Sequence, residues 1–364
     1  MNVITILGAR PQFIKAAVVS RAIARYNESK GKIMVREKIV HTGQHHDPEM
    51  SDIFFREMHI PVPAYQLRVS GLQHGAMTGR MLIEVEKLLI DEKPDWVLVY
   101  GDTNSTLAGA LAAAKLGLPV AHVEAGLRSF NRDMPEELNR IMTDRISSLL
   151  LCPSRSAVEH LRNEGIVPPS QRVAMIGDVM YDAALFYSTL APEMPEALKD
   201  GRFEKFALCT LHRAENTDNP ARMAALLSGL GRIGRDMPVL LPLHPRTRHT
   251  LNSQNLALPS GVHAIQPVGY LEMLALLRSC AVVLTDSGGL QKEAYFFQKN
   301  CITMRNETEW GELVEAGCNT IVGADADALY ASFKTSLMTA FTAPKDIYGD
   351  GNAGDKVITQ MLDV

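Results

Sequence analysis

Short runs of apolar, β-branched residues alternate with longer segments of helical periodicity along the whole chain. The runs lack the in-and-out alternation of half-exposed strands, and such continuous runs are typical of parallel strands buried on both faces. The pattern therefore predicts an α/β fold with doubly wound parallel sheets. The predicted strands cover residues 3–7, 38–41, 97–100, 120–123, 149–152 and 173–176, and then 206–211, 239–243, 263–266, 282–285, 301–304 and 320–322.

The alternation lapses once, in a stretch rich in proline and charge that resembles a linker. We therefore predict two doubly wound Rossmann-like domains that face each other across a cleft. The predicted parts are an N-terminal domain at 1–190, a linker at 191–204, a C-terminal domain at 205–345, and a terminal helix at 346–364 that could pack back on the first domain.

Composition excludes several classes of partner. With 364 residues and a formal net charge of −4, the chain has no basic excess for binding nucleic acid or anionic lipid. No apolar run approaches 18 residues, and the first residues lack the basic start of a signal peptide, so neither a membrane span nor secretion is expected. Five widely spaced cysteines in apolar runs favour reduced core thiols in a cytoplasmic protein.

Three acids follow elements that should end at one edge of the first sheet. Asp102 and Glu124 each follow an apolar strand, and Glu136 stands in the first turn of a helix. Because carboxyl ends of parallel strands face one crevice, these acids indicate proton-transfer chemistry more than packing. The alternative for Glu136 is a helix-capping carboxylate that forms an i,i+4 ion pair with Arg140.

The first loop, Gly8–Pro11, follows a strand and opens a helix whose amides could bind an anion. Arg10 and Lys15 could contact phosphates there, although Arg10 could equally be a solvated loop residue. The loop lacks G-x-G-x-x-G and is a poor dinucleotide fingerprint, so we expect no cofactor.

A stronger phosphate signal lies in the second half, where D-S-G-G follows a predicted strand and opens a helix. Ser287, Gly288 and Gly289 would let backbone N–H groups approach a diphosphate closely. Glu293, about one turn further, could bind a ribose hydroxyl. The alternative is a glycine-rich turn with an exposed helix glutamate.

Histidines also stand at predicted strand ends. His212 beside Arg213 suits a diphosphate whose charge grows as it leaves, whereas His244 is ambiguous between a structural and a binding role. Three further histidines lack the H-E-x-x-H spacing of a metal site, so we assign no metal to His41, His45 and His46.

Taken together, the motifs G-A-R-P-Q-F-I-K, H-T-G-Q-H, Y-G-D-T-N-S-T, H-V-E-A-G-L-R-S, M-P-E-E-L-N-R, L-H-R-A-E-N and T-D-S-G-G-L-Q-K-E resemble those of the non-hydrolysing UDP-N-acetylglucosamine 2-epimerases. The resemblance covers residues 4 to about 310. It implies an isomerase with a glycosyltransferase-B-like fold, a homodimer, and a UDP-sugar bound between the domains. The implied catalytic residues are Asp102, Glu124, Glu136 and His212, and the implied substrate-binding residues are Arg10, Lys15, Arg140, Ser287, Gly288, Gly289 and Glu293. The strand-end positions of Arg213 and His244 add these two residues to the predicted substrate-binding set.

The C2 hydrogen of a 2-acetamido sugar is not acidic, so epimerisation needs either transient oxidation or departure of UDP. The lack of a dinucleotide fingerprint favours anti elimination of UDP to a 2-acetamidoglucal, followed by re-addition. Two opposed acid/base groups would then be required, and the sequence leaves open which carboxylate removes the proton.

Some motifs depart from the usual UDP-N-acetylglucosamine enzymes, namely Gln12 in the first loop and the segments 177–182 and 308–314. These variants resemble the branch acting on UDP-2,3-diacetamido-2,3-dideoxy-glucuronate, which gives the manno epimer for surface polysaccharide such as O-antigen. The alternatives are a UDP-N-acetylglucosamine 2-epimerase, a glycosyltransferase of the same fold, or an inactive UDP-sugar sensor. Gln44 and His45 match a loop that binds an activating UDP-N-acetylglucosamine in some members, but the next two residues do not, which weighs against such activation here.

Overall fold

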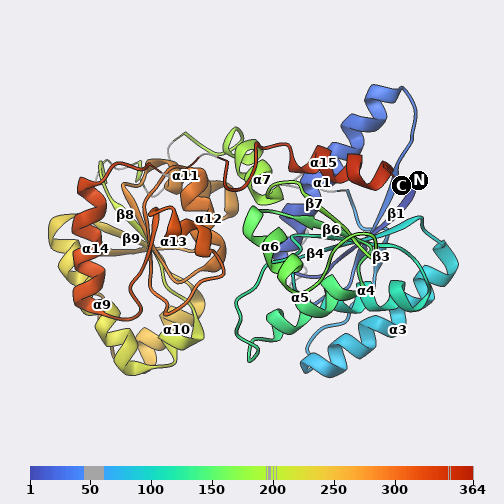
Figure 1. Cartoon of the computed structure of the whole chain (residues 1–364). Helices are drawn as coiled ribbons and strands as arrows, with labels where there is room; N and C mark the ends of the chain where they lie inside the picture. The colour runs from blue at the N-terminus through green and yellow to red at the C-terminus, as the bar shows by residue number, and fades with distance from the viewer. Residues whose placement is uncertain are drawn as a thin grey trace. The chain divides into compact units, whose positions relative to one another are not determined.

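The structure, a computed structural model, describes residues 1–44, 61–193, 195, 198–199, 201, 203–342, 344 and 346–363, apart from the side chain of Arg10. The predictions about His45 and His46 lie outside the described residues. The chain forms two compact units (Figure 1). Unit 1 comprises Met1–Ala183 with Lys345–Val364, and unit 2 comprises Ala184–Pro344.

Unit 1 contains a seven-stranded parallel sheet in the order β3-β2-β1-β4-β5-β6-β7. The edge strand β3 escaped sequence prediction because its two residues form no apolar run. The bounds are β1 Asn2–Leu7, β2 Arg36–His41, β3 Tyr65–Gln66, β4 Trp96–Tyr100, β5 Val120–Val123, β6 Leu149–Cys152 and β7 Arg172–Met175.

The helices of unit 1 bury their apolar faces on this sheet. Ile6, Val97 and Val99 of the central strands form one core with residues of α3 and α4. The bounds are α1 Arg10–Lys30, α3 His74–Glu92, α4 Asn104–Lys115, α5 Pro135–Ile146, α6 Arg155–Asn163, α7 Val179–Ser188, which crosses the boundary between units, and α15 Ala353–Leu362.

The C-terminal helix α15 lies beside α1 (Figure 1). The two helices approach closely, because a Cβ at Gly354 would lie 2.8 Å from Val18. Arg25 and Asp355 add an exposed ion pair of 2.8 Å. The last helix of the chain therefore belongs to unit 1.

Unit 2 contains a six-stranded parallel sheet in the order β10-β9-β8-β11-β12-β13. Its core gathers residues such as Leu226 and Leu230 of α9, Leu284 of β11 and Phe333 of α14. The strands are β8 Ala207–Thr210, β9 Val239–Pro242, β10 Val262–Ile265, β11 Val282–Thr285, β12 Cys301–Thr303 and β13 Asn319–Ile321. The helices are α8 Ala214–Thr217, α9 Pro220–Asp236, α10 Pro245–Ser253, α11 Tyr270–Ser279, α12 Gly288–Phe296, α13 Gly311–Glu315 and α14 Ala326–Met338.

The two doubly wound parallel sheets predicted from the sequence are confirmed. In each sheet the strand order reverses once, between β1 and β4 in unit 1 and between β8 and β11 in unit 2. Ligands of such sheets bind outside the carboxyl ends of the strands at this reversal. The turns that follow β4 and β11 therefore define where a site should be sought in each unit.

Two searches of the described residues gave negative results. None of their helices has both the length and the apolar character needed to cross a bilayer. Nor do their His, Cys, Asp and Glu side chains form a group of three that could hold a metal ion. All five cysteines are free and buried.

Candidate functional site

A cavity of about 190 Å³ opens at the carboxyl edge of the unit 1 sheet. Its walls come from the start of α1, the turn between β4 and α4, and the first turn of α5. The lining residues are Ala9, Pro11, Gln12, Lys15, Gln44, His74, Tyr100, Gly101, Asp102, Thr103, Asn104, Pro135, Glu136 and Asn139.

Asp102 is presented to this cavity by the tight turn after β4. Gly101 adopts a left-handed φ of +61°, and Thr103 closes the start of α4 by accepting a hydrogen bond from the N–H of Thr106. The Asp102 side chain is 34% exposed, because it opens to the cavity while protein surrounds its other sides. Burial raises the pKa of its carboxyl, and the positive charges of Arg140 and Lys15 oppose that rise.

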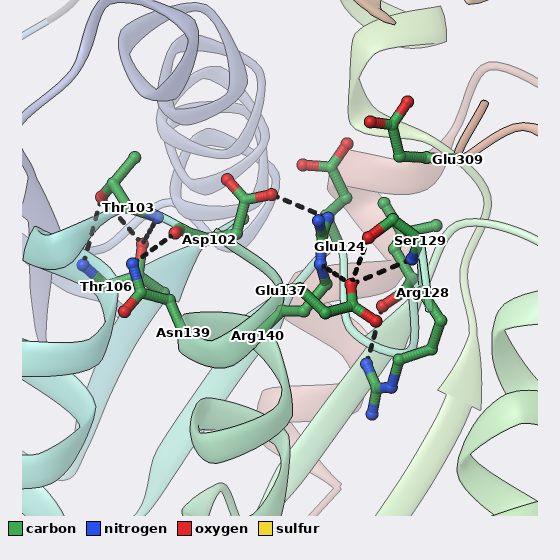
Figure 2. Close-up of polar contacts among 12 residues, drawn as sticks. Asp102, Thr103, Thr106, Glu124, Arg128, Ser129, Glu137, Asn139, Arg140 and Glu309 are labelled. Carbon is green, nitrogen blue, oxygen red and sulfur yellow. Dashed lines mark hydrogen bonds and ion pairs between the residues drawn. The ribbon is translucent and has the colours of Figure 1, made fainter. Parts of the chain in front are cut away.

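Arg140 lies between two carboxylates (Figure 2). Its guanidinium is 2.8 Å from Asp102 and 2.7 Å from Glu137. Glu137 is buried and accepts hydrogen bonds from the N–H groups of Ser129 and Phe130, each at 2.9 Å. Glu137 thus anchors Arg140, and Arg140 in turn orients Asp102.

The alternative that paired Arg140 with Glu136 is wrong. In the described structure the ion pairs of Arg140 go to Asp102 and Glu137, one position further along α5. Glu136 is exposed and lines the cavity, where its charge adds to the rise in the pKa of Asp102. Asn139, which the sequence did not single out, donates a hydrogen bond of 2.9 Å to the Asp102 carbonyl (Figure 2).

Glu124 directly follows β5 and has a left-handed φ of +73°. Such a conformation is costly for a residue with a side chain and is concentrated at functional sites. The Glu124 carboxylate is buried and contacts the ammonium of Lys15. A Cβ at Gly101 would lie 3.2 Å from this carboxylate and 3.3 Å from the ammonium, so a glycine gives the pair room.

Gln12 joins the first loop to the end of β4. Its amide oxygen accepts hydrogen bonds from the N–H groups of Gly8 and Ala9, at 2.8 and 3.0 Å. Its amide nitrogen donates to the Tyr100 carbonyl at 2.8 Å and to the Thr106 hydroxyl at 2.9 Å. Only an amide can serve all four partners, because a carboxylate has no proton for the carbonyl.

In unit 2 the turn after β11 is organised by Asp286, which is fully buried. Its carboxylate accepts hydrogen bonds from the N–H groups of His212 and Arg213, each at 2.9 Å. The side-chain amide of Asn216 donates another at 3.2 Å. Asp286 therefore holds the loop that follows β8 against the turn that follows β11.

His212 is half-buried, with its ring 5.1 Å from that of His244. Burial lowers the pKa of His212, and the positive charges of Arg213 and Arg246 lower it further against the influence of Asp286. The pKa of His244 is also lowered, chiefly by burial. Both shifts favour the neutral imidazole, which can still donate one N–H hydrogen bond.

The start of α12 has no side-chain cap among the described residues. Ser287 makes no capping hydrogen bond to any described residue, and a Cβ at Gly289 would meet no described atom within 4 Å. A Cβ at Gly288 would lie 3.5 Å from the guanidinium of Arg213. The predicted turn residues and Arg213 therefore lie together, and Glu293 is buried in the same helix.

A buried ion pair lies beside the turn at the start of α12, near Gly288. Arg305 and Glu309 are joined by two hydrogen bonds of 3.0 and 3.1 Å. Trp310 donates its indole N–H to the Gly288 carbonyl at 2.8 Å, and Lys292 lies 4.1 Å from the centre of the indole ring. These residues escaped sequence prediction, although the departure at 308–314 had marked the segment.

The predicted site residues thus form two groups, one within each unit. In unit 1, Asp102, Glu136 and Lys15 line one cavity, while Glu124 contacts Lys15 and Arg140 contacts Asp102. The Arg10 side chain lies outside the described structure, although Arg10 begins α1. The group in unit 2 comprises His212, Arg213, His244, Ser287, Gly288, Gly289 and Glu293.

Comparison with known proteins gives a consistent set of matches. A family model described as UDP-N-acetylglucosamine 2-epimerase matches residues 27–362. The UDP-2,3-diacetamido-2,3-dideoxy-D-glucuronate 2-epimerase of Pseudomonas aeruginosa is 52% identical, over 98% of both chains. The UDP-N-acetylglucosamine 2-epimerase of Methanocaldococcus jannaschii is 41% identical, also over 98% of both chains. A crystal structure from that organism, in complex with UDP-GlcNAc and UDP, superimposes with a TM-score of 0.88 and 40% identity, covering all of both chains.

Proposed function

Because the chain belongs to the UDP-N-acetylglucosamine 2-epimerase family, we propose that it epimerises C2 of UDP-2,3-diacetamido-2,3-dideoxy-D-glucuronate to the manno epimer. It is an isomerase, a UDP-sugar 2-epimerase. The observation that carries the mechanism is the cavity of unit 1, where Asp102 opens to the space and Glu124 stands close by, each beside its own cation.

The proposed reaction proceeds by elimination and re-addition. A base removes the C2 proton while the bond between C1 and the UDP oxygen breaks, which leaves a 2-acetamidoglucal with a C1–C2 double bond. UDP then attacks C1 again, and an acid delivers a proton to the opposite face of C2. The net change is inversion at C2, with no oxidant consumed.

Two carboxyl groups with different partners suit this pair of proton transfers. Burial raises the pKa of Asp102, which makes its carboxylate a stronger base toward the C2 proton than a free aspartate. Glu124 is held by Lys15 beside the same turn. Glu136 lines the cavity and, through its charge, favours the protonated form of Asp102. We assign the C2 proton transfers to these acids.

Unit 2 is proposed to bind the UDP portion. The uncapped start of α12 offers backbone N–H groups and the Ser287 hydroxyl to the diphosphate, and Arg213 adds a positive charge. His212 would donate a hydrogen bond to the departing diphosphate as negative charge develops there. Glu293 would bind the ribose.

The proposal also covers the oligomeric state, the compartment and the pathway of the enzyme. We propose a cytoplasmic homodimer that supplies sugar for surface polysaccharide such as O-antigen. The five free buried cysteines support a reducing compartment. Four large apolar side chains are exposed on α3 and α5 and support self-association: Ile83, Ile90, Leu138 and Met142. Light scattering of the purified protein would measure its mass directly.

An activity panel tests the substrate assignment. The enzyme would be incubated with the diacetamido uronate and with UDP-N-acetylglucosamine, and the sugar H1 and H2 signals would be followed by NMR. We expect the uronate to reach equilibrium with its manno epimer at least tenfold faster. Turnover of UDP-N-acetylglucosamine alone would replace the proposed substrate with the second candidate, which the 41% identity to the Methanocaldococcus jannaschii enzyme favours.

A further inference from the structure

We propose that His122 is a positioning residue for Asp102, an inference that rests on the proposed function of Asp102. His122 lies on β5 with a fully buried side chain. Its Nε2 is 2.7 Å from the Gly101 carbonyl oxygen, and its Nδ1 is 2.7 Å from a carboxylate oxygen of Asp144. The cavity that holds Asp102 does not include His122, so any influence must pass through these bonds.

The partners of the ring determine where its protons lie. A carbonyl oxygen can only accept, so Nε2 carries a proton and donates it to Gly101. Nδ1 faces a carboxylate oxygen, which also only accepts, so Nδ1 carries a second proton and donates it to Asp144. The Asp144 carboxylate therefore favours the ring with both nitrogens protonated and fixes its orientation, so that the Nε2 proton points at the Gly101 carbonyl.

The hydrogen bond from His122 fixes the orientation of the Gly101 peptide group. Its N–H donates to the Val123 carbonyl at 3.0 Å, and its own carbonyl accepts from His122. Gly101 has the left-handed φ and no side chain, so without these two bonds its backbone would be free to rotate. Asp102 comes next in the chain, and such rotation would swing its carboxyl away from Arg140.

Asp144 also reaches the loop that follows Glu124. Its second carboxylate oxygen accepts hydrogen bonds from the Gly126 N–H at 3.2 Å and from Arg128 at 2.7 Å. One fully buried carboxylate thus braces the backbone beside both proposed acids, directly near Glu124 and through His122 near Asp102. These hydrogen bonds to the backbone explain why the polar side chains of His122 and Asp144 are fully buried, where apolar side chains would otherwise be expected.

Two substitutions separate positioning from simple packing. In His122→Gln the side-chain amide nitrogen occupies the place of Nε2 and can still donate to Gly101. In His122→Asn the amide nitrogen occupies the place of Nδ1 and can reach only Asp144. We expect kcat to fall about 100-fold in His122→Asn and less than about fivefold in His122→Gln, with the Kd for UDP changed less than twofold in both.

A matched control is His160, which bonds the Gly126 carbonyl through Nδ1 at 3.0 Å but is only half-buried and does not contact Gly101. We expect His160→Gln to change kcat less than twofold. Equal losses of kcat in the Asn and Gln variants of His122, with both folded, would overturn the proposal, because the bond to Gly101 would then be irrelevant. Unchanged kcat in His122→Asn would overturn it as well.

NMR of the wild-type protein, with ¹⁵N-labelled histidine, gives a test that requires no variant. We expect the Nε2 of His122 to carry a slowly exchanging proton from pH 6 to pH 8. An unprotonated Nε2 would overturn the proposal even if both variants failed to fold. If the wild-type enzyme epimerised no UDP-sugar, the proposed function would fail, while the NMR result would still report on the hydrogen bond to Gly101.

Discussion

Asp102 and Asp286 occupy equivalent places in the two sheets and have opposite surroundings. Asp102 follows β4 and Asp286 follows β11, the two strands at which the strand order reverses. Each aspartate stands directly before the N-cap residue of the next helix. Asp286 is fully buried and accepts hydrogen bonds from three N–H donors, so it is not accessible to a substrate. Asp102 keeps one strong partner, Arg140, and opens to a cavity. We therefore infer that an aspartate at this place is available for proton transfer only where the protein leaves it partly unsatisfied.

The helices that follow these two aspartates differ in whether a side chain caps their N-terminus. Thr103 caps α4 with its own side chain, so the helix end is closed. Ser287 leaves α12 uncapped among the described residues, and two glycines follow it. In unit 1 the turn therefore presents an acid, whereas in unit 2 it presents free N–H groups. In the proposed mechanism the same strand–turn–helix unit thus serves proton transfer in one unit and anion binding in the other.

We expect the largest effect from Asp102→Asn, which tests whether the aspartate of unit 1 transfers a proton. The amide keeps the shape but cannot transfer a proton, so we expect kcat to fall about 10³-fold. The Kd for UDP should stay within twofold, because the proposed UDP contacts belong to unit 2. Turnover by NMR and UDP titration by calorimetry measure the two quantities. Wild-type turnover in this variant would remove Asp102 from the mechanism.

The reciprocal change, Asp286→Asn, should act on binding and folding. Its amide would point a donor at the N–H groups of His212 or Arg213, so the loop after β8 would lose its anchor. We expect UDP affinity to fall about 30-fold and stability to fall by about 3 kcal/mol, measured by calorimetry and urea unfolding. Asp218→Asn, an exposed aspartate near the same loop, is the control and should change neither.

Gly289→Ala tests whether the open start of α12 is reserved for a phosphate. The protein itself tolerates the added Cβ, since no described atom lies within 4 Å of it. Alanine also favours helix by about 1 kcal/mol, so we expect stability to be unchanged or slightly higher. UDP affinity should nevertheless fall about tenfold, because the methyl group would meet the diphosphate. Unaltered affinity would show that the ligand does not approach this turn.

Asp182 gives a smaller, pH-dependent effect that involves neither site. It accepts a hydrogen bond from the Gly354 N–H at the start of α15, and burial raises its pKa to about 6. A carboxyl with a raised native pKa binds its proton more tightly in the folded state, so its contribution to stability falls as pH rises from about 4 to about 6.

Asp182→Asn should therefore stabilise the protein by about 1 to 2 kcal/mol at pH 8 and have little effect at pH 4. Urea unfolding at the two pH values measures the difference. Asp327→Asn, which removes an exposed ion pair with Arg232 in unit 2, is the control and should shift stability by less than about 0.5 kcal/mol at either pH. A stabilisation that did not depend on pH would exclude the charge of Asp182 as its cause.

Sequence alone predicted the fold well because buried parallel strands leave continuous apolar runs. The edge strand β3 was missed because it has no such run. The positions of Asp102 and Glu124 at the sheet edge could be predicted from the strands they follow, since both strands point the same way. The residues at the ligand-binding edge of a parallel sheet can therefore be predicted from where the strands end in the sequence.

Other features of the site depend on contacts between distant segments. Glu136 and Glu137 are neighbours on α5, but only Glu137 meets the N–H groups of Ser129 and Phe130, and that loop decides which glutamate anchors Arg140. The roles of Gln12 and His122 likewise follow from bonds to β4 and the turn after it. The sequence marked Gln12 only as a departure in the first loop and His122 only as part of a motif, and neither pattern predicts these bonds.

The central claim, elimination at C2 by acids of unit 1, is tested most directly by running the reaction in heavy water. The wild-type enzyme would be incubated with the diacetamido uronate in D₂O, and NMR would follow the H2 signals of both epimers. We predict that each molecule of manno epimer carries deuterium at C2, because the proton removed there is replaced from solvent. An epimer that formed while keeping its original C2 hydrogen would contradict this mechanism.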